Sequence, residues 1–186
     1  MIAYSTGEII NASNFGRSLD VSQPTIKKYM EIIEGTFLWR KLAPYEKSKT
    51  KRVSKMPRGH LRDTGLINYL LNISNVQSLK GHQLYGRIWE GFITEQIIKG
   101  VDRNLIKYSS YFYRTNNQSE IDLIIEGRFG TIPIKIKSGS NTSIKQLKTL
   151  ENFVKAESCP YGIVVNNGDQ IYKLSNKIIQ VPAIFL

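Results

Sequence analysis

The sequence is poor in metal-binding and disulfide-forming residues and has no long apolar run. It contains one cysteine, Cys159, and two histidines, His60 and His82. One cysteine cannot form an internal disulfide, which is typical of a protein of the reducing cytoplasm. These three residues are also too few for a Cys/His zinc site. No stretch approaches the roughly 18 apolar residues of a transmembrane helix, and residues 1–5 lack the basic and apolar regions of a secretory signal. We therefore expect a cytoplasmic protein without membrane contact.

A nucleotide-binding P-loop is also absent. The pattern G-x-x-x-x-G-K-[ST] does not occur anywhere in the 186 residues. We expect that this chain does not itself bind ATP. The length allows one domain or two small ones.

Positive charge is abundant, and it is concentrated in one segment. The chain has 26 Lys and Arg against 15 Asp and Glu, a formal net charge of +11. Residues 40–62 hold nine basic residues and one acidic residue, Glu46, so this segment alone carries +8. The nine are Arg40, Lys41, Lys47, Lys49, Lys51, Arg52, Lys55, Arg58 and Arg62. A local cluster of cations favours contact with a polyanion; a solvated lysine-rich loop is the alternative.

The residues before this segment predict a helix-turn-helix. Ser13 is expected to cap a short helix over 14–20, with Phe15 and Leu19 on its buried side. Ser22 is the expected N-cap of a second helix, which carries Pro24 in its first turn. Apolar residues then recur at helical spacing: Ile26, Tyr29, Met30, Ile33 and Phe37. The opposite face of this second helix presents the candidate DNA-reading residues Gln23, Thr25, Lys27 and Lys28.

A β-hairpin is predicted after the second helix. Residues 37–45 and 59–62 have strand character, and the lysine-rich residues 47–55 lie between them. This layout is typical of a winged helix, whose wing contacts DNA phosphates. The expected phosphate contacts are Lys47, Lys49, Lys51, Arg52 and Lys55. Glu31 and Glu34 on the second helix keep a protein-docking role open as the alternative.

The remainder predicts an α/β fold with a mixed sheet. A short helix capped by Asp63 or Thr64 and a polar linker over 72–83 lead into a helix that begins near Leu84. Strands are predicted over 108–114, 120–126, 131–137, 161–166, 170–173 and 178–181, with a helix over 142–157. The expected organisation is a winged helix-turn-helix over 1–62, a connection over 63–84 and an α/β domain over 85–186.

Strand alternation predicts which polar side chains meet in this second domain. Ile121, Leu123 and Ile125 should share one face, leaving Glu120 and Asp122 on the other. Lys135 and Lys137 of the next strand should then face these carboxylates. Solvated cross-strand pairs, each worth less than about 1 kcal/mol, are the alternative. On the preceding helix Glu90 and Glu95 point about 140° apart, so both cannot reach one site.

Four segments of the chain resemble a known family. They are 22–29 (SQPTIKKY), 61–66 (LRDTGL), 89–92 (WEGF) and 120–123 (EIDL). They are similar to the C-terminal half of bacterial and archaeal ATP-binding proteins, a region called DUF4143, and the likeness runs from about Ser5 to the C-terminus. The resemblance implies an AAA-type P-loop ATPase upstream or in trans. It also implies that the second domain has the core of a PD-(D/E)XK nuclease.

The resemblance assigns candidate catalytic residues one by one. Glu90 matches the helix glutamate, Asp122 the strand aspartate and Lys137 the motif lysine, and Glu90 and Asp122 would hold Mg²⁺. Lys135 stands where the second metal-binding carboxylate belongs. This replacement changes the local charge by two units, so we expect weak metal binding or none.

Three functions remain open at this point. The first is a nucleic-acid-binding module, without a cofactor, that binds double-stranded DNA and has a degenerate, inactive nuclease-like domain. The second is a Mg²⁺-dependent DNA nuclease that relies on Glu90, Asp122 and Glu120. The third is a protein-docking or regulatory module without DNA contact.

Overall fold

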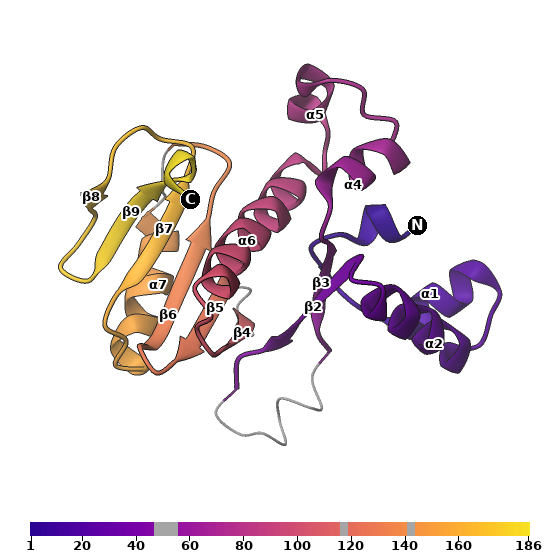
Figure 1. Cartoon of the computed structure of the whole chain (residues 1–186), viewed down its shortest axis with the longest axis horizontal. Coiled ribbons are helices and arrows are strands. Elements are labelled where there is room, and N and C mark those ends of the chain that lie inside the picture. Colours follow the sequence, from indigo (N-terminus) through magenta and orange to yellow (C-terminus); the bar gives the residue numbers. More distant parts are fainter. Residues whose placement is uncertain (47–55, 116–118, 141–143) are drawn as a thin grey trace.

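The chain forms a nine-stranded mixed sheet that carries helices on both faces (Figure 1). The computed structural model describes residues 1–46, 56–115, 119–140 and 144–186. Along the sheet the strand order is β1-β3-β2-β4-β5-β6-β7-β9-β8. The predicted α/β class with a mixed sheet is therefore confirmed. The winged-helix and nuclease-like assignments within it stay predictions.

The helices and strands occupy the following residues. The N-terminal elements are a 3-10 turn at Ile2–Ser5, β1 (Glu8–Ile9), α1 (Ala12–Leu19), α2 (Gln23–Gly35), β2 (Trp39–Pro44) and β3 (Arg58–Leu61). The middle of the chain holds α4 (Thr64–Leu70), α5 (Val76–Gly81) and α6 (Tyr85–Arg103). The C-terminal elements are β4 (Tyr108–Arg114), β5 (Glu120–Gly127), β6 (Gly130–Ile136), α7 (Ile144–Ala156), β7 (Gly162–Asn166), β8 (Tyr172–Lys173), β9 (Ile178–Pro182) and a 3-10 turn at Ala183–Phe185.

The caps of α1 and α2 show where local sequence signals hold and where they fail. Ser22 caps α2 as predicted, because its hydroxyl accepts a hydrogen bond from the Thr25 amide. For α1 the prediction was wrong: Asn11, not Ser13, is the N-cap, and its side-chain oxygen accepts from the Ser13 and Asn14 amides. Asparagine and serine are similarly good caps, so the sequence offered two starts for this helix.

The apolar stripe predicted for α2 is only partly buried. Ile26 is in the core, but Tyr29 is half exposed. Phe37 lies beyond the end of the helix at Gly35, has a left-handed φ of 61° and is 74% exposed. Leu19 of α1 is also exposed rather than buried. The stripe fails at Phe37 because helical periodicity no longer applies once the helix has ended.

The predicted hairpin is confirmed in its two strands. β2 and β3 pair antiparallel, with Trp39 opposite Leu61 and Leu42 opposite Arg58. The predicted wing tip, residues 47–55, lies outside the described residues. β2 also pairs in parallel with β4 through Ala43 and Pro44. The N-terminal hairpin is consequently part of the same sheet as the C-terminal strands.

The connection between the hairpin and α6 is more structured than predicted. Asp63 caps α4 as expected, through a hydrogen bond from the Leu66 amide to Oδ1. The linker predicted over 72–83 contains a short helix, α5, which Asn75 caps by accepting from the Ser78 amide at 2.8 Å. The prediction missed this helix because the stretch is mostly polar.

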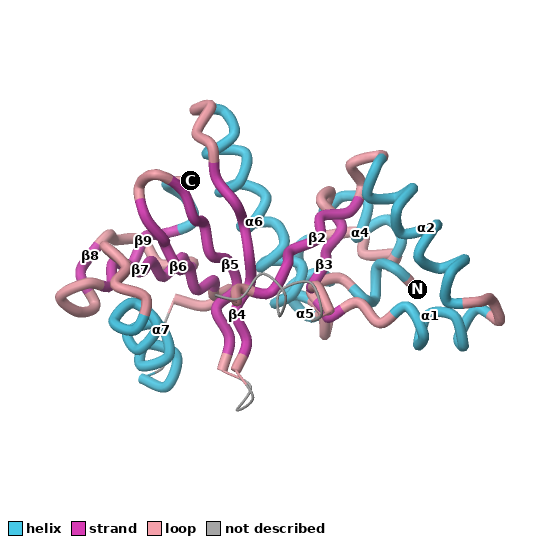
Figure 2. Tube along the Cα trace, turned by 90° about the horizontal axis from the view of Figure 1, so that it is seen from below, coloured by secondary structure: helices cyan, strands magenta, loops and turns pink. Residues whose placement is uncertain are grey.

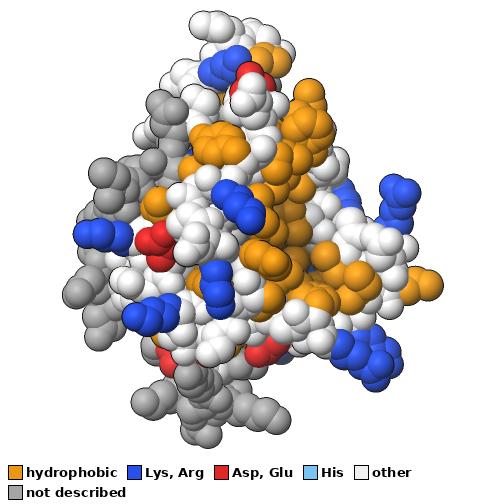
Figure 3. Space-filling view, turned by 90° about the vertical axis from the view of Figure 1, so that its left-hand side faces the viewer, with side chains coloured by type: hydrophobic (Ala, Val, Ile, Leu, Met, Phe, Trp, Pro, Cys, Tyr) orange, Lys and Arg blue, Asp and Glu red, His pale blue; other side chains and the backbone are white. Residues whose placement is uncertain are grey.

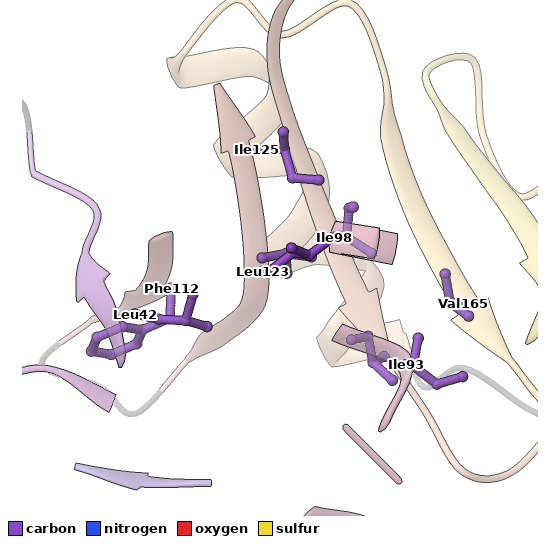
Figure 4. Close-up of a cluster of buried hydrophobic side chains, with 9 residues drawn as sticks. Leu42, Ile93, Ile98, Phe112, Leu123, Ile125 and Val165 are labelled. Carbon is purple, nitrogen blue, oxygen red and sulfur yellow. The ribbon is translucent and has the colours of Figure 1, made fainter. Parts of the chain in front are cut away.

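The two faces of the C-terminal sheet carry separate cores. Ile93 and Ile98 of α6 pack with Leu123 and Ile125 of β5 on one face (Figure 4). On the other face, α7 contributes Leu150, Phe153 and Val154, which pack with Ile121 and Ile124 of β5. α7 and β8 lie at the opposite end of the molecule from α1 and α2 (Figure 2).

A bulge in β5 overturns the predicted alternation of that strand. Tyr111 of β4 pairs with Ile124, but Tyr113 pairs with Ile121, so β5 has one extra residue between the two pairs. Ile121 therefore packs with α7, whereas Leu123 packs with α6. A bulge re-aims side chains locally, and this one lies at Asp122.

The end of the molecule that carries β8 shows a stripe of exposed apolar side chains (Figure 3). Ile171, Tyr172 and Ile184 are among the exposed large apolar residues of this part of the chain. In the described part of the chain, no helix is both long enough and apolar enough to cross a membrane.

Candidate functional site

The structure brings Glu90 and Asp122 into one cluster together with two cations. Glu90 extends from α6 and Asp122 from the bulge in β5. Arg58 of β3 donates to Glu90 Oε2 at 2.6 Å, and its other terminal nitrogen lies 3.7 Å from Asp122 Oδ1. Lys135 of β6 donates to Asp122 Oδ1 at 2.9 Å. Arg58 thus bridges the two carboxylates that the family resemblance assigned to a metal, and Lys135 adds a second cation at Asp122.

Most of this ion-pair network is buried, and Glu90 is its most exposed member. Asp122 is 2% exposed and Lys135 is 8% exposed. The second oxygen of Asp122 accepts a 2.7 Å hydrogen bond from the Ile136 amide. Burial raises the pKa of the Glu90 carboxyl, and Asp122 raises it further, while Arg58 and Lys135 act in the opposite direction. Each Asp122 oxygen therefore already has a donor.

The cluster does not form a ready-made metal site. The described residues include no group of three or more His, Cys, Asp or Glu side chains that could hold a metal ion. Mg²⁺ prefers several oxygen ligands in near-octahedral geometry. A cation of this kind at Asp122 would have to displace Lys135 and Arg58, whose charges also repel it.

Two other predicted residues lie beside the cluster without joining it. Glu120 pairs with Arg114 at 3.1 Å. Lys137 follows β6, and its backbone carbonyl accepts from the indole nitrogen of Trp89 at 3.0 Å. Burial lowers the pKa of the Lys137 ammonium, and the charge of Lys135 lowers it further.

An open polar cleft lies next to the cluster. Its volume is about 410 Å³, and ion pairs between arginines and glutamates line it. Besides Arg58 with Glu90, the pairs are Arg87 with Glu8 and Arg114 with Glu120. The cleft is therefore lined by charges of both signs.

A second buried network centres on Glu95, five residues after Glu90 on α6. Glu95 accepts hydrogen bonds from Arg40, from Arg62 at 3.0 Å and from His60 at 3.1 Å. These three partners hold the pKa of the Glu95 carboxyl far below its usual range, despite its burial. Burial lowers the pKa of His60, so its imidazole is neutral near pH 7. As expected from their angular separation, the two glutamates reach different sites.

These networks use several cations of the basic segment, residues 40–62, as partners of carboxylates within the protein. Three arginines of this segment turn inward: Arg40 and Arg62 to the buried Glu95, and Arg58 to Glu90 and the buried Asp122. Lys41 lies 3.8 Å from Glu34 on the surface. All four described cations of the segment are therefore ion-paired, and the other five lie outside the described residues. Sequence reasoning missed the role of Arg58 because no local pattern distinguishes an inward arginine from a solvated one.

The candidate DNA-reading residues occupy the first turns of α2. Gln23, Lys27 and Lys28 are exposed, while the hydroxyl of Thr25 lies 2.8 Å from that of Ser22. Gln23 and Lys27 also line a cavity of about 550 Å³ between the helices and the base of the hairpin, and Glu31 lines it as well. The surface of α2 is thus mixed in charge.

Comparison with known proteins places the C-terminal part of this arrangement in a family. Residues 85–184 match a family described as a domain of unknown function, DUF4143. Because this match covers more than half of the chain, the chain belongs to that family. Residues 1–77 match a second family, also described as a domain of unknown function, DUF8612. No solved structure matches the chain.

Two mycobacterial proteins are similar over nearly the whole chain. One is an uncharacterized protein of Mycobacterium bovis and the other an uncharacterized protein of Mycobacterium tuberculosis; each is 29% identical over 183 residues. The matched region covers 98% of this chain but 40% of each relative. The chain therefore spans well under half the length of these relatives.

Proposed function

We propose that the chain is a non-catalytic nucleic-acid-binding module. In this proposal a winged helix contacts double-stranded DNA, and a degenerate PD-(D/E)XK nuclease-like domain follows it. A P-loop ATPase supplied upstream or in trans would act on the bound DNA. The observation that carries the proposal is the occupation of the Asp122 and Glu90 carboxylates by Lys135 and Arg58.

The charge balance of the cluster supports the loss of catalysis. A nuclease of this type needs a divalent cation that polarises the phosphate and activates a water molecule. Here Lys135 donates to Asp122 Oδ1, and Arg58 binds Glu90. Two fixed cations can attract a phosphate, but they cannot lower the pKa of a bound water as a metal ion does.

The distribution of unpaired cations supports DNA contact. Lys27 and Lys28 are exposed at the start of α2, and no described carboxylate forms an ion pair with either. Residues 47–55, between β2 and β3, contain five cations and no acidic residue. Such cations supply the sequence-independent part of DNA affinity by releasing counterions.

The first experiment tests the segment between β2 and β3. Lys47, Lys49, Lys51 and Arg52 are replaced together by alanine, and duplex binding is measured by fluorescence anisotropy across a salt series. The slope of log affinity against log salt should fall by about 0.9 for each DNA phosphate that the variant no longer neutralises. Affinity for unrelated duplexes should fall equally.

A matched control separates a local contact from net charge. Four lysines are exposed on other surfaces: Lys80, Lys148, Lys155 and Lys173. Their replacement by alanine also removes four positive charges. This control should retain most of the affinity. Equal reductions in both variants, or no reduction in either, would contradict a DNA contact by residues 47–55.

The second experiment tests α2 as the element that reads sequence. Replacing Thr25 and Lys28 by alanine should change the preferred DNA sequence in a selection experiment more than it changes total affinity. A variant with both its sequence preference and its affinity unchanged would indicate that α2 is a docking surface for a protein.

The third experiment tests whether the cluster around Asp122 binds a metal ion and cleaves DNA. Isothermal titration of Mn²⁺ should show no binding to the natural chain and measurable binding to Lys135→Glu, because the substitution reverses the two-unit charge change. A plasmid-nicking assay with Mg²⁺ and with Mn²⁺ should show no cleavage by the natural chain. Nicking that disappears in Asp122→Asn would instead identify the chain as a nuclease.

A further inference from the structure

An aromatic and polar stripe runs along one face of α6, separate from the carboxylate cluster. Tyr85, Trp89, Phe92, Gln96 and Lys99 follow one another at alternating spacings of four and three residues, which places them in one row on a helix. The ring centroids of Tyr85 and Trp89 lie 6.4 Å apart, and those of Trp89 and Phe92 lie 6.2 Å apart. No member of this stripe is fully buried.

Phe37 continues the stripe from a different element. With Phe92, Gln96 and Lys99, it lines a pocket of about 390 Å³ beside the base of the hairpin. Phe37 is 74% exposed, and its φ of 61° is a strained value for a bulky residue. Strained residues persist where the surrounding structure fixes them, and they gather at functional sites. An exposed ring held in this conformation is well placed to receive a ligand.

Cations lie next to these rings. The guanidinium of Arg62 lies 5.9 Å from the centre of the Phe37 ring, and its hydrogen bond to the buried Glu95 holds it there. Lys99 is exposed, and no described carboxylate is within ion-pair distance of it. The pocket has one exposed acidic side chain among its described lining residues, Asp63, whose oxygen caps α4.

The other end of the stripe lies beside a further lysine. The indole nitrogen of Trp89 donates to the backbone carbonyl of Lys137, which follows β6, and the partly buried ring also packs against the core. Successive aromatic rings with cations beside them are how proteins bind unpaired nucleic acid: the bases stack on the rings and the phosphates meet the cations.

We propose that the α6 stripe and the Phe37 pocket bind an unpaired nucleotide or short single strand. A base stacks on Phe37 and Phe92, Gln96 offers hydrogen bonds to its edge, and Lys99 and Arg62 meet its phosphate. This inference rests on the proposed function in that the ligand is a nucleic acid. The site is distinct from the duplex contacts proposed for α2 and residues 47–55.

The test compares four probes by fluorescence anisotropy. They are a 15-nucleotide oligothymidine, an abasic strand of the same length, a duplex of the same length, and thymidine monophosphate as a competitor. The natural chain should bind oligothymidine about 10-fold more tightly than the abasic strand, because only the former has bases to stack. Competition by the mononucleotide at similar concentration would identify a free nucleotide, rather than a strand, as the source of the base.

Variants locate the effect. Phe37→Ala with Phe92→Ala should abolish the preference for bases while leaving duplex affinity unchanged. Phe37→Leu, which keeps the bulk without the aromatic ring, should reduce the preference alone. The control pair Tyr172→Ala and Ile184→Ala removes two exposed apolar side chains from the β8 end of the molecule and should behave like the natural chain.

The outcomes also separate this inference from the proposed function. Weaker duplex binding in the α2 or 47–55 variants, with the base preference intact, supports both sites independently. A natural chain that binds the duplex but shows no preference for oligothymidine over the abasic strand would overturn the stacking site alone. A double alanine variant that is folded by circular dichroism and still prefers bases would overturn it too, because the bases would then stack elsewhere on the chain.

Discussion

The buried carboxylate of Glu95 links α6 to both strands of the β2–β3 hairpin, and replacing it by glutamine tests that link. Glu95 is 1% exposed and accepts from Arg40 of β2, His60 of β3 and Arg62 just after β3. Glutamine preserves the shape of the side chain and removes its charge. Arg40 and Arg62 then keep their charges without a carboxylate to balance them.

The loss of folding stability expected for Glu95→Gln depends on how deeply Arg40 and Arg62 are buried. Removing one member of a buried ion pair costs about 3–5 kcal/mol of folding stability, because the remaining charge is desolvated and unpaired. The side chains of Arg40 and Arg62 are 18% and 25% exposed and recover some hydration. We therefore expect a decrease of about 3 kcal/mol for Glu95→Gln. Such a decrease is large beside the roughly 5–15 kcal/mol that stabilises a typical domain.

Urea unfolding at pH 7.5 measures this decrease as a lower midpoint at an unchanged slope. The matched control is Glu34→Gln, because Glu34 pairs with Lys41 at 3.8 Å on the surface, where both side chains are nearly half exposed. An exposed pair of this kind contributes less than about 1 kcal/mol. If Glu95→Gln were no more destabilising than Glu34→Gln, the Glu95 network would not hold the hairpin to α6.

Three further perturbations have defined outcomes. Burial lowers the pKa of His60 and keeps it neutral in the folded protein, whereas His60 of the unfolded chain binds a proton below about pH 6.5. The free energy of unfolding should therefore decrease as the pH is lowered from 7.5 to 5.5, by at most about 1.4 kcal/mol per pH unit. Urea titrations of His60→Gln should show a weaker dependence on pH. Gly59→Ala should destabilise the protein by more than about 2 kcal/mol, since the new Cβ would overlap the buried Trp39 indole. Gly100→Ala, whose Cβ would meet no neighbour, should be neutral or stabilising by up to about 1 kcal/mol. Thermal unfolding of the two variants measures both effects. Ile136→Ala, at a position with no exposure, should cost about 2–5 kcal/mol in urea unfolding, and a cost below about 1 kcal/mol would show that the α6 side of the sheet is loosely packed.

The local elements could be predicted because their signals lie within a few residues of chain. The start of α2 follows from Ser22 and Pro24, whose capping chemistry involves only the first turn. The β5–β6 hairpin follows from the adjacent strand-forming segments 120–126 and 131–137, and it closes with Gly127 opposite Gly130. The contact of Lys135 with Asp122 could also be predicted from the sequence, because the two residues are neighbours across that same hairpin.

The remainder of the candidate site depended on contacts between distant parts of the chain. Arg58 meets Glu90 and Asp122 only because β3 and α6 come together beside β5, and no periodicity in the sequence specifies that meeting. The bulge at Asp122 arises from the pairing of β5 with β4.

The sequence by itself determined the start of α2, the two hairpins and the carboxylate–lysine pair of one hairpin, because backbone capping and strand pairing act over short separations. The tertiary structure alone decided which cations of the basic segment turn inward, since burying an arginine is favourable only where a desolvated carboxylate pairs with it. It also decided that Phe37 stays exposed beside Phe92, because that position depends on where α2 ends and on how α6 lies against the hairpin.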